Sequence, residues 1–282
     1  MTRRVIAFIT DEARVHGTHD DLLVVAPLRE RGIEVRFVPW EHAERNADIA
    51  AWIVRSPWNY HLRSAAFLDR IGPLAPLHNP LGLIRWNSDK HYLLELAEAG
   101  VPIIPTVFSP REALAEVAEA TGWEEVVVKP CVSAAGLGTR RVRSEAFFAA
   151  RSFEGLPEGE YLVQPFLDDV CHEGEVSCVF FNGVYSHSVR KRAAEGHFLV
   201  HEEHGGTVAA TVPNPDVIAE SEAVLRACPE AGLYARVDWI ETERGPKLVE
   251  VELIEPELFL RAHPLAPGRF ADAIARTLGG GS

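Results

Sequence analysis

The chain has 282 residues, of which 47% are hydrophobic, and it carries a formal net charge of −13 at pH 7. This length is sufficient for two or three domains, and the excess of acidic residues argues against a general nucleic-acid-binding protein, which requires a basic face. No segment approaches the roughly 18 apolar residues of a membrane span, and the apolar run Val5–Thr10 is too short for a signal peptide. We therefore expect a cytoplasmic protein with neither a nucleic-acid nor a membrane partner.

Residues 1–85 alternate between strand and helix patterns. The segments Val5–Thr10, Glu34–Val38 and Ala51–Val54 are rich in the residue types of buried strands. After the first of them, Asp20–Arg31 carries a helical apolar face and stops at Gly32. Strands that alternate with helices predict a parallel α/β sheet.

Two helices and a strand are expected in the middle of the chain. The first helix begins at Asn87–Lys90. The second has clear start signals, because Ser109 can cap it, Pro110 suits its first position and Glu112 completes a capping box. The buried strand Glu125–Lys129 follows this second helix.

The strands of the C-terminal half are longer and are expected to be antiparallel. Val176–Phe181 and Val184–Val189 are joined by Asn182-Gly183, which is the strongest short hairpin signal. The remaining predicted elements are a helix at Asp216–Cys228, strands at Ala235–Ile240 and Leu248–Ile254, and a last helix at Arg269–Leu278. The pattern predicts a small α/β domain followed by an α+β region.

A loop of small residues follows the strand that ends in a lysine. Lys129 leads into Ser133–Gly138, where glycine and alanine let backbone N–H groups approach a phosphate and the lysine supplies a positive charge. The alternative is an ordinary turn with Lys129 reaching solvent. Gly136-Leu-Gly138 also begins a dinucleotide pattern, but Arg141 stands where the third glycine belongs, which disfavours a nicotinamide-dependent dehydrogenase.

Three acids lie in neighbouring apolar strands near the end of the chain. Glu250 and Glu252 are two residues apart in a strand, so both side chains lie on one face. Asp238 lies in the preceding strand, and three converging carboxylates would repel one another unless a hard cation such as Mg²⁺ joined them. The alternative is a solvent-facing strand in which the acids pair with Arg236 or Lys247. Three acids in apolar strands favour the metal.

Two other clusters contain basic residues or residues that could bind a metal ion. Arg190-Lys-Arg192, at the end of a hairpin strand, suggests an anionic ligand, with a solvated strand end as the alternative. His197, His201 and His204 suggest zinc, but they lack the spacing of the H-E-x-x-H motif, so structural zinc is disfavoured.

In combination these features resemble an ATP-grasp ligase. Two lysines, Lys90 and Lys129, are followed by the small-residue loop and the late acidic strands in the order of that family, and the resemblance covers most of residues 78–262. The broad match is to the glutathione-synthetase type, and a closer likeness is to the D-cycloserine synthetase group, which closes the cycloserine ring. The segments that carry it are Val54–Tyr60, Asn79–Lys90, Gly174–Gly183, Tyr185–Arg192 and Val251–Pro256.

The resemblance implies a mixed α/β and α+β chain, in which the ATP-grasp fold follows an N-terminal Rossmann-like (pre-ATP-grasp) domain. We expect this N-terminal domain at residues 1–86. A central ATP-grasp subdomain with the lysines and the phosphate loop is expected at 87–160. A C-terminal subdomain with the hinge, the substrate loop and the metal site is expected at 161–282.

The resemblance also implies the residues that bind ATP and Mg²⁺, with Mn²⁺ as the alternative cation. The two lysines hold the α- and β-phosphates, the loop closes over the γ-phosphate, and the hinge stacks and hydrogen-bonds adenine. The loop residues are Ser133, Ala134, Ala135, Gly136 and Gly138, and the hinge residues are Gln164, Pro165, Phe166 and Leu167. Glu175 reaches the ribose or the hinge, and Arg190 lies near the reacting phosphate or acyl phosphate. Lys129, Gly136 and Arg190 are the catalytic candidates.

The metal ligands implied are Asp238, Glu250 and Glu252. The commonest pattern of the family has Glu-x-Asn at the last two, whereas this chain has Glu250-x-Glu252. A carboxylate can replace an amide oxygen as a ligand, and it adds negative charge. We therefore expect cation binding to be preserved.

The function implied is an ATP-dependent carboxylate–amine ligase that acts through an acyl phosphate on an amino acid or an analogue of one. Cyclisation, as in cycloserine synthesis, and intermolecular ligation both remain open. The alternative is a non-catalytic nucleotide-binding module for sensing or scaffolding. The substrate is expected to contact Arg55, whose planar fork suits a carboxylate unless it forms a structural ion pair, and His201, His204 and Gly206. A homodimer is common among such ligases.

Overall fold

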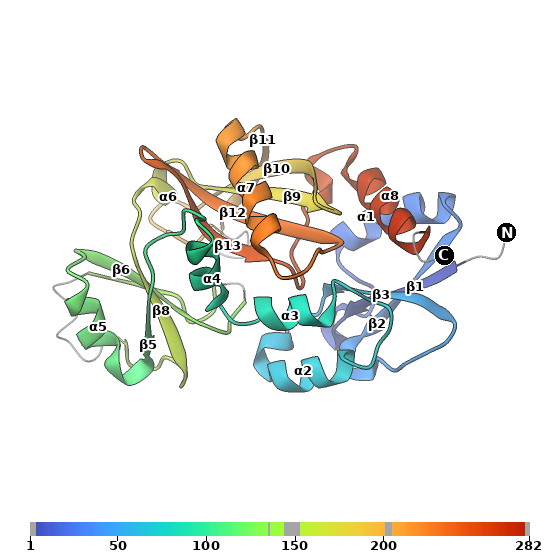
Figure 1. Ribbon diagram of the computed structural model, residues 1–282, viewed down its shortest axis with the longest axis horizontal. Coiled ribbons are helices and arrows are strands. Elements are labelled where there is room, and N and C mark those ends of the chain that lie inside the picture. Colours follow the sequence, from blue (N-terminus) through green and yellow to red (C-terminus); the bar gives the residue numbers. More distant parts are fainter. Residues whose placement is uncertain (1–3, 135, 144–152, 201–204, 280–282) are drawn as a thin grey trace.

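The computed structural model describes residues 4–134, 136–143, 153–200 and 205–279. These residues form three sheets, with the strand orders β2-β1-β3-β4, β11-β10-β9-β12-β13 and β5-β8-β6-β7. The first sheet and the last sheet lie at opposite ends of the molecule, with the five-stranded sheet between them (Figure 1). Among the described residues, no helix combines the length and the apolar character needed to cross a membrane.

The N-terminal sheet is parallel, as the alternating pattern predicts. Its elements are β1 (Arg4–Thr10), α1 (His19–Glu30), β2 (Ile33–Pro39), β3 (Ile49–Ser56), α2 (Ser64–Ile71), β4 (Leu77–His78) and α3 (Leu81–Asn87), with 3₁₀ turns η1 (Glu12–Arg14), η2 (Trp40–His42) and η3 (Tyr60–Arg63). Successive residues of β1 face opposite sides of the sheet, so Ile6 and Phe8 join one core cluster while Ala7 and Ile9 join another. The segments after β1 and β3 leave the sheet at its carboxyl edge, where ligands bind in open α/β folds.

The small sheet is antiparallel. Its region comprises α4 (Tyr92–Glu98), β5 (Val107–Pro110), η4 (Arg111–Ala113), α5 (Leu114–Ala120), β6 (Glu125–Pro130), β7 (Arg140–Arg143) and β8 (Glu160–Pro165). The predicted capping box is wrong. Ser109 lies in β5 opposite Tyr161 of β8, and its hydroxyl donates to the Pro110 carbonyl rather than to the helix. Pairing between strands has overridden the local cap signal.

The predicted start of a helix at Asn87–Lys90 is wrong, because these residues lie at the end of one helix and before the next. The helix α3 ends at Asn87, and α4 begins only at Tyr92. The Asn87 amide instead binds β13 and the residue after it, donating to the Val251 carbonyl at 2.7 Å and accepting from the Leu253 N–H at 2.8 Å. Asn87 therefore fixes the end of the strand that carries Glu250 and Glu252.

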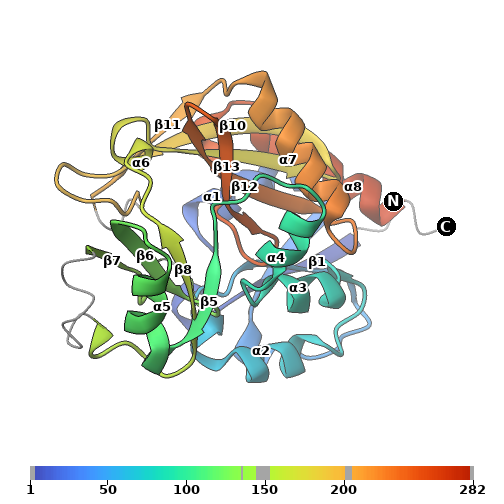
Figure 2. The ribbon, with the colours of Figure 1, turned by 60° about the vertical axis from the view of Figure 1, so that its left-hand side comes forward.

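The five-stranded sheet is antiparallel throughout. The C-terminal elements are α6 (Asp169–His172), β9 (Glu175–Phe181), β10 (Val184–Arg192), β11 (Thr207–Thr211), α7 (Pro215–Ala227), β12 (Tyr234–Thr242), β13 (Gly245–Glu252), η8 (Leu260–Ala262) and α8 (Ala266–Gly279). The predicted hairpin between β9 and β10 is confirmed, with positive φ values of 49° at Asn182 and 74° at Gly183. The helix α8 returns to pack beside α1 of the N-terminal region (Figure 1). Figure 2 shows α5 against the small sheet of β5 to β8.

Buried polar contacts join the N-terminal sheet to the segment that follows β13. The Asn79 amide donates to the carbonyls of Tyr234 and Leu253 at 2.9 and 2.7 Å. The Tyr234 hydroxyl lies 2.5 Å from the Val54 carbonyl and 2.7 Å from that of Ile254. These contacts hold the carboxyl edge of β3 against residues 253–259.

His187 of β10 makes the fold sensitive to acid. Its ring is 3% exposed, with Nε2 2.9 Å from the Leu258 carbonyl oxygen and Nδ1 2.9 Å from the Ser186 hydroxyl. Burial lowers the pKa of His187 from 6.5 to about 4. The unfolded chain therefore takes up this proton first as pH falls, and stability is lost between pH 6.5 and about 4.

We expect the wild-type protein to lose about 2 kcal/mol more unfolding free energy than the His187→Gln variant when the pH falls from about 7.5 to about 5. Glutamine keeps a donor and an acceptor but does not titrate. Urea unfolding of both proteins at the two pH values measures the difference. Equal losses would show that His187 is not the acid-sensitive group.

Candidate active site

A cavity of about 570 Å³ receives side chains from two of the sheets and from segments that follow strands of the third. The small sheet contributes Lys129 and Gln164, and the five-stranded sheet contributes Glu175, Lys191, Glu250 and Glu252. The loops after β1 and β3 add Arg14, Trp58 and Tyr60. This volume falls within the range of small-molecule sites, and the charged residues gather where the strands of the large sheet face the N-terminal loops.

Two of the three predicted acids, Glu250 and Glu252, line this cavity, and the third, Asp238, is fully buried beside them. Asp238 of β12 is paired in register with Glu250 of β13, and Glu252 follows on the same face of β13. One carboxylate oxygen from each of the three lies within 4.8 Å of the others. Three hard oxygen ligands at this separation fit a divalent cation such as Mg²⁺. The period-two argument for Glu250 and Glu252 is therefore confirmed in geometry.

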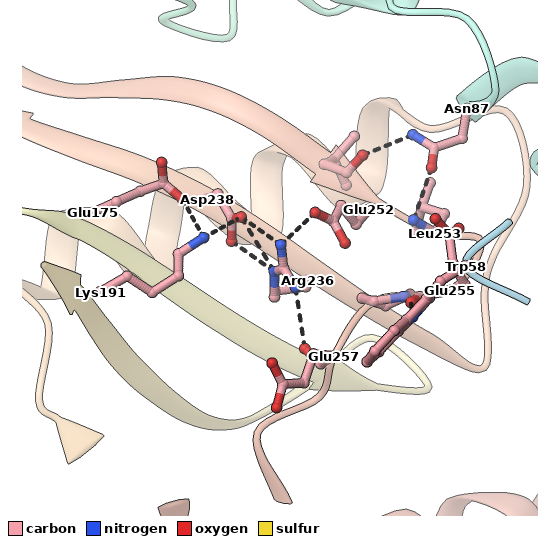
Figure 3. A network of polar contacts seen from close by, with 12 residues as sticks. Trp58, Asn87, Glu175, Lys191, Arg236, Asp238, Glu252, Leu253, Glu255 and Glu257 are labelled. Atoms are coloured by element: carbon pink, nitrogen blue, oxygen red, sulfur yellow. Dashed lines mark hydrogen bonds and ion pairs between the residues drawn. The ribbon is translucent and has the colours of Figure 1, made fainter. Parts of the chain in front are cut away.

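Two positively charged side chains, Arg236 and Lys191, lie among the acids Asp238, Glu252 and Glu175 (Figure 3). The Arg236 guanidinium donates to both oxygens of Asp238, with Nε 3.0 Å from Oδ1 and Nη2 2.9 Å from Oδ2, and also to Glu252. Lys191 donates to Asp238 at 2.9 Å and pairs with Glu175. Arg236 therefore does pair with the acids, as the alternative prediction proposed. The three carboxylates nevertheless remain close to one another.

Burial and these cations set the charge of each acid. Burial raises the pKa of Asp238, but the charges of Arg236 and Lys191 outweigh it and hold that pKa below its ordinary value. Burial raises the pKa of Glu252 to about 8 and that of Glu175 to about 7 against the same cations. Lys90 and Lys129 lower the pKa of Glu250 in spite of its burial. The site therefore holds more carboxyl groups than its own cations can keep ionised, which favours an added cation.

The two predicted lysines face the cavity with different partners. Lys90 Nζ donates to the carbonyl and the hydroxyl of Ser133, at 3.1 and 3.2 Å. The Lys129 ammonium group makes no hydrogen bond or ion pair with any other residue that the structure describes, and burial lowers its pKa. An ammonium group turned into a cavity without a protein partner is suited to an anionic ligand such as a phosphate.

The loop between β6 and β7 has a conformation in which its backbone can come close to a bound ligand. Gly136 and Gly138 have φ values of 68° and 76°, which glycine adopts without strain. A Cβ atom at Gly138 would lie 2.8 Å from Cγ of Pro130, so a side chain there requires the loop to move. Ser133, Ala134 and Gly136 line the cavity, whereas Ala135 lies outside the described residues.

The predicted hinge forms the apolar end of the cavity. Gln164 is buried and donates to the Thr106 hydroxyl at 2.9 Å, and the Arg141 guanidinium lies 3.5 Å from the centre of the Phe166 ring. Pro165 and Leu167 line the same end. The apolar lining here is completed by Ile104, Val127, Val170, Val200, Ile240 and Val249. An aromatic ring such as adenine fits this lining.

The structure does not bring Arg190 into the cavity. Successive residues of a strand point to opposite faces, so Lys191 faces the acids while Arg190 pairs with Glu241 at 2.5 Å and donates to the Glu173 carbonyl at 2.9 Å. The basic cluster was identified in the sequence, but the member that lines the cavity is Lys191.

Neither of the two predicted substrate residues that the structure describes, Arg55 and Gly206, lines the cavity. Arg55 is 2% exposed and pairs with Asp21 at 3.0 Å, so its ion-pair alternative is the one found in the structure. His201 and His204 lie outside the described residues.

Sequence reasoning missed the site residues that the tertiary fold supplies. Arg236 was considered only as a partner for the acids, although its spacing of two residues from Asp238 places both on one face. Trp58 and Tyr60 belong to a segment that carries the family resemblance, which was a usable signal. Glu255, which follows the strand of Glu250 and Glu252, was not among the predicted site residues, and it lines the cavity.

Comparison with known proteins agrees with this geometry. Residues 6–79 match the N-terminal domain of D-cycloserine synthetase DcsG. The cycloserine biosynthesis protein DcsG of Streptomyces lavendulae is 32% identical over 97% of this chain and 99% of its own length. A crystal structure of D-cycloserine synthetase DcsG superposes with a TM-score of 0.86 at 29% identity, covering 97% of this chain and 99% of that chain.

A more distant likeness bears on the fold alone. The ATP-grasp ligase PsnB, solved with a phosphomimetic variant of its minimal precursor, Mg and ADP, has a TM-score of 0.69 at 14% identity and is matched over 99% of both chains. These structural matches confirm the predicted mixed fold, in which an N-terminal parallel sheet precedes antiparallel sheets.

Proposed function

The chain belongs to the ATP-grasp ligase family and is an ATP-dependent ligase that forms amide bonds, and from this premise we propose that it closes a small amino acid into a ring. In this reaction ATP phosphorylates the substrate carboxylate, and a nitrogen of the same molecule then displaces the phosphate. The products are a cyclic amide, ADP and inorganic phosphate.

One observation carries the proposal at the phosphate end. Lys129 faces the cavity opposite the Glu250 carboxylate and has no partner among the described residues, while Lys90 is held by Ser133 beside it. The phosphates of ATP, bound between these lysines and the three acids, would contact the lysine ammonium groups on one side and the predicted metal site on the other. Mg²⁺, when bound by Asp238, Glu250 and Glu252, neutralises charge on the transferred phosphoryl group.

Arg236 supports the acyl-transfer half of the proposal. Its guanidinium is oriented by Asp238 and by the Glu257 carbonyl, which accepts from Nη1 at 3.2 Å. A planar donor held in this way is suited to the carbonyl oxygen of the substrate as negative charge develops there. Lys191, oriented by Asp238 and Glu175, adds a second fixed charge. The small-residue loop of residues 133–138 is suited to excluding water from the acyl phosphate.

The cyclising reaction is favoured by the relatives. The cycloserine biosynthesis protein matches nearly the full length of both chains. Cycloserine is a cyclic hydroxamate, in which the carboxyl carbon of a serine-derived amino acid is bonded to a nitrogen carried by the side-chain oxygen. Ring closure forms this carbon–nitrogen bond and breaks the bond between the acyl carbon and phosphate. We therefore propose a β-aminooxy amino acid or a derivative of it as the substrate.

Substrate-dependent ADP release in the presence of Mg²⁺ tests the proposal. The panel consists of D- and L-amino acids and both enantiomers of β-aminooxyalanine, with hydroxylamine as an external nucleophile. We expect β-aminooxyalanine to support ADP release without hydroxylamine and to give a cyclic product by mass spectrometry. Turnover only with hydroxylamine or with a second amino acid would favour intermolecular ligation. Absence of substrate-dependent ADP release across the panel would count against the proposed substrate class.

The second glutamate of the pair gives a direct test of the metal site. We expect Glu252→Gln to raise the Mg²⁺ concentration for half-maximal ADP release by about tenfold or more, because the variant removes a charged oxygen from the three-acid set. Glu241→Gln, on the same sheet but paired with Arg190, is the matched control. An unchanged Mg²⁺ titration would show that Glu252 does not bind the ion.

A further inference from the structure

A fourth carboxylate stands at the end of the cavity nearest the N-terminal domain. Glu255 follows β13 and lines the cavity. Its main-chain carbonyl accepts from Nε1 of Trp58 at 3.2 Å, which fixes this residue against the segment after β3 (Figure 3). The position of Glu255 is therefore set jointly by the N-terminal domain and by the strand that carries Glu250 and Glu252.

The Glu255 carboxylate differs from its acidic neighbours because it lacks a partner. Glu252 pairs with Arg236, and Glu257 pairs with Arg261. Within the described ranges, the Glu255 carboxylate makes neither a hydrogen bond to another side chain nor an ion pair. Burial, together with the negative charge of Glu252, raises the pKa of Glu255 to about 8. A half-buried carboxylate without a partner is stabilised by an added cation.

The groups around Glu255 favour an organic cation over a metal ion. Glu255 stands outside the set of three acids whose oxygens lie within 4.8 Å of one another, and one carboxylate alone is a poor Mg²⁺ site. The rings of Trp58 and Tyr60 line this end of the cavity, and aromatic faces attract ammonium groups. The nearby Arg14 is already engaged, since it pairs with Asp11 at 2.6 Å and lies 4.4 Å from the centre of the Trp58 ring.

Tyr60 lines the same cavity as Glu255. The Tyr60 side chain is 5% exposed, and burial raises the pKa of its hydroxyl. The next largest contribution to that rise is the charge of Glu255, ahead of Glu252 and Glu250. Glu255 therefore lies near enough to Tyr60 for its charge to affect the hydroxyl, and both residues line the cavity.

We propose that Glu255 binds the α-ammonium group of the substrate amino acid and so makes a free α-amine a requirement for efficient turnover. The inference rests on the proposed function, because it assumes that the substrate carboxylate binds next to Arg236 and is phosphorylated there. In an α-amino acid the ammonium nitrogen and the carboxylate are attached to the same carbon. A carboxylate three residues beyond Glu252, on the segment that also supplies the Glu257 carbonyl to Arg236, is suited to this second group.

The test compares two probes that differ only in the α-ammonium group. They are β-aminooxyalanine, in the enantiomer that the wild-type enzyme uses, and 3-(aminooxy)propanoic acid. We expect Glu255→Gln to lower kcat/KM for β-aminooxyalanine by about ten- to a hundredfold, with little change for the probe that lacks the amine. The loss of discrimination, rather than of activity, identifies the contact. Glu255→Asp, which keeps the charge, is expected to recover part of the discrimination.

Glu257→Gln is the matched control, because Glu257 also lines the cavity but is already paired with Arg261. This variant is expected to discriminate between the probes as the wild type does. Thermal unfolding and calorimetric ATP binding establish that each variant is folded. A folded Glu255→Gln variant that still discriminates as the wild type does would overturn the inference while leaving the proposed function intact. Absence of ADP release by the wild-type enzyme with either probe would overturn both.

Discussion

Replacing Lys129 by alanine is expected to lower kcat/KM for ATP by about 10²–10³-fold without unfolding the protein. Lys129 is the penultimate residue of the strand β6 and lines a cavity that also holds Glu250 and Glu175. Burial lowers its pKa, so its charge is maintained chiefly by these two acids. A phosphate bound there would gain a fixed cation that has no competing partner among the described residues, and alanine would remove it.

Lys247→Ala is the control for this variant. Lys247 lies on β13 opposite Ile240 and does not line the cavity. ADP release measures the effect on turnover, calorimetry measures ATP affinity, and circular dichroism measures folding. Because the Lys129 side chain makes no hydrogen bond or ion pair with the described residues, we expect the two variants to unfold at similar temperatures. Normal turnover by a folded Lys129→Ala protein would remove this lysine from the site.

Replacing Asp238 by asparagine is expected to cost about 3–5 kcal/mol of unfolding free energy and to abolish turnover. Asp238 is fully buried and accepts hydrogen bonds from Arg236 and from Lys191. Asparagine keeps the shape but removes the charge that offsets these two buried cations. It also removes the negative charge of one of the three ligands assigned to Mg²⁺, so the structural and catalytic losses have the same origin.

Urea unfolding, with Glu241→Gln as the control, separates this effect from the loss of an ordinary ion pair. Glu241 lies on the same strand and pairs with Arg190, but both groups are partly exposed, and such pairs contribute about 0–1 kcal/mol. If Asp238→Asn and Glu241→Gln lost the same stability, Glu175 and Glu252 would be sufficient partners for the cations. The assignment of Asp238 as the central acid would then be wrong.

The sequence predicted those parts of the site that depend on local periodicity. Glu250 and Glu252 share a face because they are two residues apart in a strand, and the hairpin at Asn182-Gly183 follows from its turn residues. Arg190 and Lys191 show the limit of this argument. A shift of one residue in the register of a strand reverses every side chain, and the sequence alone did not fix which member of the basic cluster faced the acids.

Other features depended on contacts between distant segments. Ser109 carried a strong cap signal, but pairing of β5 with β8 placed it in a strand. The contact between Trp58 and the Glu255 carbonyl joins residues that are 197 positions apart. Glu255 could not be recognised as a site residue without that contact, because it follows the strand and no local pattern indicates which way it points.

The contacts of Asn79 and Tyr234 bear on how this enzyme could be redesigned. Residues 6–79 correspond to a domain that is recognisable by itself in related chains, which invites its exchange for the same domain of a relative. Yet the Tyr234 hydroxyl binds carbonyls on both β3 and residue 254, and Asn79 binds the Leu253 carbonyl. A chimera that replaced residues 6–79 alone would change one side of this junction and leave the other. Residues 253–259 should therefore be transplanted together with the N-terminal domain.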